Sequence, residues 1–193
     1  MNFSSKDLDQ FGRKYPPKAG DYYVPSITTD AIVLRKIQEK INILLITRKN
    51  PPYQNGLALP GGFLDYNEDP ITGCLRELEE ETQLKGNNAV LFDVRGIPVR
   101  DPRGHTVSIV YKVQVDENQM PVAQDDAKIA KFYDLQLILE ANQKQLKFQQ
   151  EKYLNKLEVI KEDQFQNINQ GNQYPVAFDH LLILNNLYAQ LQN

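Results

Sequence analysis

The feature that most constrains this chain is an acidic cluster that follows a glycine pair in LPGGFLDYNEDPITGCLRELEEETQL, residues 59–84. Aspartate caps helix N-termini and proline suits the first helical position, so Asp69 and Pro70 predict a helix start. The predicted helix ends in four acidic residues: Glu77, Glu79, Glu80 and Glu81. Each carboxylate in a last helical turn costs roughly 0.3–1 kcal/mol, because the helix dipole is negative there. The positive charge that would offset them is therefore expected to be missing from the sequence itself.

The two faces of this predicted helix differ in character. Glu77, Glu80 and Glu81 share one face, since helical positions three and four residues apart are neighbours. An apolar face, suited to packing on a sheet, holds Ile71, Cys74, Leu75 and Leu78. A solvated charged face is the ordinary interpretation, but lysines four residues further on are absent for Glu77, Glu79 and Glu80. Carboxylates are the ligands that Mg²⁺ takes in proteins, so the pattern favours a metal site.

Residues 62–84 resemble the signature of the Nudix hydrolases, GX5EX7REUXEEXGU, in which U is apolar. Its fixed positions are matched by Gly62, Glu68, Arg76, Glu77, Leu78, Glu80, Glu81 and Leu84. Gln83 stands where the signature has its second glycine, the residue that would end the helix in a left-handed conformation. A non-glycine residue there costs about 1 kcal/mol, so the helix is expected to run on to Gly86 instead.

The resemblance implies an α/β/α sandwich with a mixed β-sheet, and Mg²⁺-dependent hydrolysis of a nucleoside diphosphate linked to another group, with Mn²⁺ as the alternative cation. It also implies that Gly62, Glu77, Glu80 and Glu81 are the metal ligands. Arg76 lies four residues before Glu80 and can orient its carboxylate, although a plain surface ion pair fits equally well. The resemblance gives Glu68 an ordering or metal-linked role.

Two further segments resemble the small ADP-ribose pyrophosphatases: IPVRDPRGHT, which contains Pro98 at the place of a proline typical of that subgroup, and VAFDH near the C-terminus. They imply cleavage of ADP-ribose to AMP and ribose 5-phosphate. The alternatives are a Nudix hydrolase of NADH, diadenosine polyphosphates or another nucleotide sugar, and a non-catalytic sensor that binds ADP-ribose.

Candidate substrate-binding residues are Gly61, Pro98, Arg100, Arg103 and His105, although the last three also fit a polar turn. Candidates for stacking on adenine are Tyr22, Tyr23 and Phe132, which are equally good core residues. The predicted catalytic residues are Arg76, Glu80, Glu81 and Asp126.

The general base is expected among these acids, since a carboxylate must take the proton of the attacking water. Glu80 and Glu81 are the options within the signature. Asp125 and Asp126 are the options outside it, and Asp126 is preferred over its interpretation as a solvated turn residue. As a contact for the substrate, His180 has a weaker case than His105, because a polar residue in a first helical turn is unremarkable.

The rest of the chain is expected to complete one domain, residues 1–193, with an N-terminal tail over 1–25. Apolar β-rich runs predict adjacent strands over 26–36 and 40–50. Residues 135–162 predict a polar helix or helix pair, and a helical insertion rich in Gln and Asn is expected over about 140–173. The final amphipathic segment predicts a helix with Asp179 as its N-cap.

The Nudix resemblance implies a small-molecule nucleoside diphosphate as the partner. The net charge is -3 and the basic residues are scattered, so neither nucleic acid nor membrane binding is expected. Cys74 is the single cysteine, which excludes an internal disulfide and favours a reducing, cytoplasmic setting. A homodimer is one option for the assembly.

Overall fold

The computed structural model describes residues 18–19, 22–156 and 158–192, with side chains described for 24–153 and 158–192. Most of the predicted tail, and the side chains of Tyr22 and Tyr23, lie outside these ranges. Within them, β1 (Lys18–Ala19) pairs with β2 (Tyr22–Tyr23) ahead of the main body of the fold.

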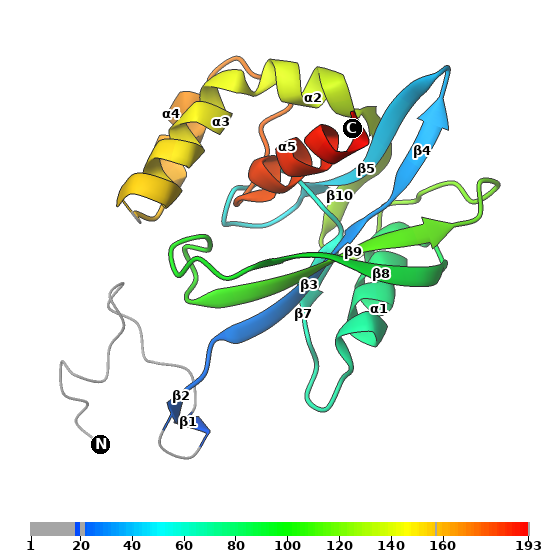
Figure 1. The fold of residues 1–193 in the computed structure, drawn as a ribbon, viewed down its shortest axis with the longest axis horizontal. Helices are drawn as coiled ribbons and strands as arrows, with labels where there is room; N and C mark the ends of the chain where they lie inside the picture. Colours follow the sequence, from blue (N-terminus) through cyan, green and yellow to red (C-terminus); the bar gives the residue numbers. More distant parts are fainter. Residues whose placement is uncertain (1–17, 20–21, 157, 193) are drawn as a thin grey trace.

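Two four-stranded sheets form the centre of the molecule (Figure 1). The first is mixed and has the order β7 (Gly61–Phe63), β3 (Ser26–Ile32), β9 (Thr106–Val115), β8 (Gly86–Arg95). Only β3 and β9 are parallel in it. The second is antiparallel and has the order β10 (Ala127–Asp134), β5 (Lys40–Arg48), β4 (Leu34–Ile37), with β6 (Leu57–Ala58) also on β5. The expected pairing of the two apolar runs is confirmed only for the end of the first run, in the β4–β5 hairpin, because residues 26–32 form β3 in the other sheet.

The helices lie on both sides of these sheets. α1 (Pro70–Thr82) packs on β3 and β7, whereas α5 (His180–Leu191) lies on the other side with α2 (Leu135–Ala141) and α3 (Gln143–Gln150) (Figure 1). A π-helical turn, η2 (Glu151–Lys156), and α4 (Glu162–Ile168) follow α3. The predicted α/β/α sandwich with a mixed sheet is confirmed. No helix in the described ranges is both long and apolar enough to span a bilayer.

Strand alternation supplies the two apolar cores that hold these layers together. Leu44 of β5 is buried in a cluster with Cys74 and Leu78, the apolar face predicted for α1. Its neighbours Ile43 and Leu45 belong to the larger cluster that contains the apolar residues of α5. Because successive strand residues point to opposite faces, one strand anchors both helices.

Both ends of α1 are set by single residues. The Asp69 carboxylate accepts a hydrogen bond from the Ile71 amide at 2.9 Å, which confirms the predicted start. The predicted extension to Gly86 is wrong, because the helix ends at Thr82 and Gln83 takes the left-handed conformation at a φ of 59°. The chain has to turn there, since Leu84 is fully buried beside Leu78 and β8 begins at Gly86.

Replacing Gln83 by glycine should stabilise the protein. The change relieves a left-handed conformation that costs an L-residue about 1–2 kcal/mol, against about 0.5–1 kcal/mol of extra chain entropy lost by glycine. Urea unfolding should therefore show a gain of about 0.5 kcal/mol for Gln83→Gly, and no gain for the control Gln83→Ala. Equal stability of the two variants would contradict this reading of the helix end.

Candidate active site

A cavity of about 320 Å³ lies where the end of β5, β7, the acidic face of α1 and the loops after β8 and before β10 meet. Its acidic lining consists of Asp30, Asp65, Glu77, Glu80, Glu81, Asp101, Asp125 and Asp126. Its basic lining consists of Arg48, Arg76, Arg100, Arg103 and His180. Of the predicted site residues, Gly61, Gly62, the signature residues Arg76, Glu77, Glu80 and Glu81, Arg100, Arg103 and Asp126 all line it.

Arg76 is the positive partner that the acidic helix requires. Its Nε and Nη2 atoms each lie 2.8 Å from a carboxylate oxygen of Glu68. Its Nη1 atom donates to Glu77 at 2.8 Å and to Glu80 at 3.0 Å. These hydrogen bonds, helped by the Asp65 amide, lower the pKa of Glu68 to about 2. Arg76 therefore orders three carboxylates at once, whereas the sequence suggested such a contact for Glu80 alone.

Glu81 lies deeper than its neighbours. Its side chain accepts a hydrogen bond from the Gly61 amide at 2.9 Å and is only 4% exposed. Burial raises the pKa of Glu81 to about 8, against the opposing effect of the Gly61 amide, and the charge of Glu77 adds to the rise. Burial also raises the pKa of Glu77. For Glu77 the Arg76 guanidinium only partly offsets this burial, and for Glu81 the charge of Arg48 does the same.

The residues at this end of the cavity fit a hard divalent cation. A side chain at Gly62 would collide with the Glu77 carboxylate, so glycine is what allows backbone and carboxylate to come together. The oxygens of Glu77, Glu80 and Glu81 are the donors that Mg²⁺ or Mn²⁺ prefers. Among the described residues no three acidic, His or Cys side chains already form a ligand cluster, and Arg76 occupies oxygens of Glu77 and Glu80.

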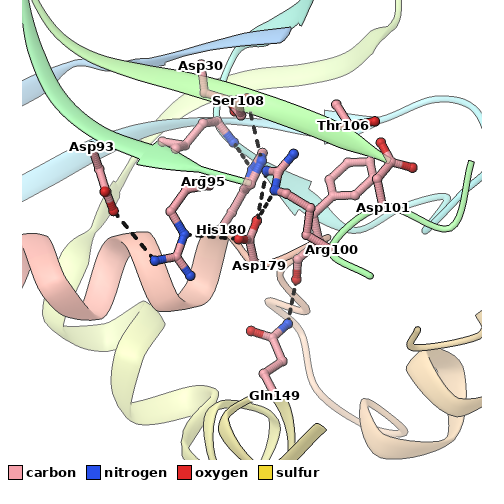
Figure 2. A network of polar contacts seen from close by, with 12 residues as sticks. Asp30, Asp93, Arg95, Arg100, Asp101, Thr106, Ser108, Gln149, Asp179 and His180 are labelled. Carbon is pink, nitrogen blue, oxygen red and sulfur yellow. Dashed lines mark hydrogen bonds and ion pairs between the residues drawn. The ribbon is translucent and has the colours of Figure 1, made fainter. Parts of the chain in front are cut away.

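A second polar network fixes the opposite wall (Figure 2). The Asp179 carboxylate is fully buried and accepts hydrogen bonds from Arg95 Nε at 3.1 Å and Arg100 Nε at 3.0 Å. Although burial opposes ionisation, these guanidiniums hold the pKa of Asp179 below its ordinary value. Asp179 stands at the predicted N-cap of α5 but makes no side-chain capping bond there, because it binds the arginines instead. Arg100 lines the cavity with its charge already paired.

Arginine and aromatic side chains alternate beside this network. The guanidinium of Arg103 lies 4.9 Å from the Phe63 ring centre and 5.4 Å from that of Phe178. Arg48 lies 4.9 Å from the same Phe178 ring. Asp101, which is 1% exposed, binds Arg103 through both carboxylate oxygens. We call these arginines and aromatic rings the basic wall, in which Asp101 already pairs with Arg103.

Asp126 lies at the mouth of the cavity. It is exposed and accepts a hydrogen bond from Asn50 Nδ2 at 2.8 Å. Its neighbour Asp125 has a positive φ of 46°. The Gln124 amide donates to the Glu81 carbonyl at 3.1 Å, so this loop is tied directly to the end of α1. The structure thus brings the loop acids and the signature acids to one cavity.

Three predicted contacts are not brought to the cavity. His105 is exposed and lies 3.3 Å from the Gly96 carbonyl, and neither His105 nor Pro98 is among the lining residues. Phe132 lies beneath Arg35 at 4.3 Å and packs against the core cluster of α1. The core interpretation of Phe132 therefore holds, and His105 belongs to a turn.

The sequence patterns gave little indication that His180 belongs to the site and none that Asp30 does. The Nδ1 atom of His180 accepts a hydrogen bond from the Leu59 amide at 3.0 Å, and its Nε2 atom lies 3.5 Å from Asp30. Asp30 also accepts a hydrogen bond from Ser108 (Figure 2). Burial lowers the pKa of His180, so the ring is a neutral bridge between β3 and α5. The only sequence signal for it is the VAFDH resemblance, because spacing does not reveal a contact across the fold.

Comparisons with known proteins agree with this fold and site. The family model described as NUDIX domain matches residues 25–157. An ADP-ribose pyrophosphatase of Methanocaldococcus jannaschii is 40% identical over 66% of this chain and 78% of its own. A bifunctional NMN adenylyltransferase/ADP ribose pyrophosphatase of Francisella tularensis, solved with AMP and a manganese ion, is 26% identical with a TM-score of 0.59. That alignment covers 89% of this chain but only 43% of the Francisella chain.

The fold match extends beyond the family model. The NUDIX domain of Shewanella oneidensis NrtR, solved with ADP ribose, covers 91% of this chain and 94% of its own at a TM-score of 0.66. It is 22% identical, and another NrtR structure contains a 27mer DNA. The family model spans most of the sequence and coincides with the acidic helix, so the chain belongs to the Nudix family.

Replacing Asp179 by asparagine should destabilise the fold strongly. The change removes the ion-pair partner of the buried Arg100 and one of the two partners of the half-buried Arg95, and breaking a buried ion pair costs about 3–5 kcal/mol. Urea unfolding of Asp179→Asn should show a loss of that size. Asp93→Asn is the matched control, since Asp93 is a partly exposed partner of Arg95 at 3.6 Å and should cost less than about 1 kcal/mol. Equal losses would contradict a central role for Asp179.

The metal-free protein should lose stability as pH rises through the range of Glu81. A group whose pKa is raised on folding stabilises fully below its unfolded value of 4.5 and loses that contribution as pH approaches 8. In EDTA, urea unfolding at pH 5 and pH 8 should show a decline in wild type that is smaller in Glu81→Gln. Parallel pH dependence of the two proteins would refute the pKa shift.

Proposed function

We propose that this chain hydrolyses the pyrophosphate bond of ADP-ribose to give AMP and ribose 5-phosphate. The observation that carries the proposal is one cavity lined both by the acidic face of α1 and by arginine and aromatic side chains. The 40% identical ADP-ribose pyrophosphatase of Methanocaldococcus jannaschii supports the choice of substrate. A nucleotide sugar, NADH or a diadenosine polyphosphate is the alternative substrate within the same family.

Gly62, Glu77, Glu80 and Glu81 would hold the divalent cation, with Mg²⁺ preferred and Mn²⁺ as the alternative. When bound, such a cation polarises phosphate oxygens and lowers the pKa of an attacking water. Arg76 keeps Glu77 and Glu80 oriented from the side, through hydrogen bonds of 2.8 and 3.0 Å. The Gly61 amide holds Glu81 in place. Gly61 thereby contributes to the site through its backbone.

The basic wall would bind the nucleoside and terminal ribose ends of the substrate. Arg103 presents its guanidinium between Phe63 and Phe178, and such arginine–aromatic pairs offer both a flat surface and hydrogen-bond donors. Arg100 holds the loop in place through Asp179. Because this wall is fixed by a buried ion pair and the acidic helix by partly buried ones, the substrate is oriented by a largely pre-formed site.

Asp126 is the proposed general base. It is exposed at the cavity mouth and held by Asn50, so its carboxylate is accessible to water. Glu80 and Glu81 remain the alternative bases within the signature. A base removes the proton of the attacking water as the new bond to phosphorus forms.

A sensor that binds ADP-ribose without cleaving it is the second candidate. The fold match to Shewanella NrtR over nearly its whole NUDIX domain supports this class. The retained carboxylates Glu77, Glu80 and Glu81 favour the hydrolase. A homodimer, the absence of nucleic acid partners, a single domain over 1–193 and a cytoplasmic location stay predictions.

Metal-dependent turnover with a single glutamate variant tests the hydrolase. Purified protein with Mg²⁺ should release AMP and ribose 5-phosphate from ADP-ribose, and EDTA should abolish the release. Glu80→Gln should lower kcat by about 100-fold or more. Glu79→Gln should be nearly neutral, because Glu79 lies on another face of α1 and pairs at 3.3 Å with Lys85. Chromatography of the products measures the release of AMP and ribose 5-phosphate in each of these reactions.

Each alternative gives a distinct result in this assay. Cleavage of NADH or a diadenosine polyphosphate with ADP-ribose left intact would overturn the substrate. Calorimetric binding of ADP-ribose without turnover would identify a sensor. Equal activity of Glu80→Gln and Glu79→Gln would remove Glu80 from the site.

A further inference from the structure

Three carboxamide side chains on one face of α3 and the residue before it bind an extended segment near the C-terminus. Asn142 donates to the Tyr174 carbonyl at 2.8 Å, Gln145 to the Val176 carbonyl, and Gln149 to the Phe178 carbonyl at 2.6 Å. We call Asn142, Gln145 and Gln149 the amide ladder. Each of these side chains, here called a rung, binds a carbonyl two residues further along residues 174–178 than the rung before it.

The spacing of the rungs matches the spacing of the carbonyls. Residues at i, i+3 and i+7 share a helix face, and seven residues of helix rise about 10 Å. Four residues of extended chain from Tyr174 to Phe178 span about 13 Å. Glutamine side chains are long enough to bridge the small difference between this span and the helical rise. Gln145 also accepts a hydrogen bond from the Val176 amide at 3.3 Å, as a neighbouring strand would.

The side chains of the amide ladder are buried inside the protein. The three carboxamides are between 1% and 2% exposed, although glutamine and asparagine are usually solvated. A buried amide without a partner costs roughly 1–3 kcal/mol, so the ladder is favourable only while the segment stays in place. The sequence suggested a polar helical insertion here, and the structure turns these three of its polar side chains inward.

The segment is held on its other edge by β6. The Leu57 amide donates to the Pro175 carbonyl at 2.6 Å, and the Ala177 amide donates to the Leu57 carbonyl at 2.7 Å. Residues 174–178 are thus bound by a strand on one side and by side-chain amides on the other. This arrangement fixes the direction in which the chain enters the cavity wall.

The chain needs such support because Phe178 is strained. Its φ is 51°, a left-handed conformation that costs an L-residue about 1–2 kcal/mol. Figure 2 shows the Gln149 amide reaching the backbone next to Asp179. Phe178 and His180, on either side of Asp179, both line the cavity. The last rung therefore lies directly behind the wall that faces the substrate.

We propose that the amide ladder positions the Phe178–His180 wall for substrate binding, an inference that rests on the proposed function. Gln149 touches neither substrate nor metal, so it is a positioning residue. Its loss should release the Phe178 carbonyl and let the wall leave its strained conformation. Substrate affinity then falls, whereas the acidic end of the cavity, on another element, keeps its geometry.

Gln149→Met tests this proposal, because methionine has nearly the same length but cannot donate the hydrogen bond. Gln143→Met is the matched control on the same helix, since Gln143 is exposed and its side chain donates to the Leu139 carbonyl of α2 instead of to residues 174–178. For Gln149→Met, KM for ADP-ribose should rise about tenfold and kcat should change less than twofold. The control should match wild type in both constants.

Amide hydrogen exchange provides a readout that needs no substrate. Exchange in the peptide that covers residues 174–180 should accelerate about tenfold in Gln149→Met, with α1 unchanged. Gln149→Asn, which keeps the amide but shortens the side chain, should give the same local acceleration. Thermal unfolding of each variant separates this local effect from global loss of the fold.

The outcomes distinguish the ladder from the proposed function. If wild type does not cleave ADP-ribose, the proposed function fails, while local exchange still reports whether the ladder holds the wall. If exchange accelerates but KM stays unchanged, the positioning role is refuted. Unchanged exchange, an equal fall in kcat and kcat/KM, or global unfolding of both variants would also overturn it.

Discussion

The site depends on one guanidinium that lies among carboxylates. Four glutamates in the last turns of a short helix repel each other and oppose its dipole. Arg76 lies on the same helix and contacts Glu68, Glu77 and Glu80 together, so the charge is ordered before any ligand arrives. The acidic face can then stay partly buried beside Gly61 and Gly62. The closely spaced carboxylates that destabilise the end of α1 are the same groups that could bind a cation.

Asp179 plays a comparable part on the other side of the cavity. It joins the loop that carries Arg100 to the start of α5, segments far apart in the sequence. A fully buried carboxylate is tolerated only when cations surround it, so loop and helix have to meet in one geometry. The two walls of the cavity are therefore each organised by a buried or half-buried ion pair.

Local patterns predicted the parts of the fold that local chemistry determines. Asp69 and Pro70 gave the start of α1, and apolar alternation gave the pairing of β4 with β5. The acidic end of the site followed from the spacing of the signature. The end of α1 was predicted wrongly, because burial of Leu84 outweighs the conformational preference of Gln83.

Contacts across the fold were beyond such patterns. Asp30 and His180 are far apart in sequence and meet only because β3 and the start of α5 do. Asp179 occupies its predicted cap position, but its carboxylate binds two arginines that no spacing rule connects to it. The inward-facing amides of Gln145 and Gln149 were hidden in a composition that resembles a solvated segment.

The edge of residues 174–178 that side-chain amides bind has an evolutionary consequence. A strand contact made by backbone atoms survives most substitutions, because every residue type except proline carries the same amide and carbonyl. A contact made by glutamine disappears with a single codon change. One border of the binding wall therefore depends on side chains that a single substitution can remove. Ligand preference in descendants of this sequence can change in this way while the sheets stay as they are.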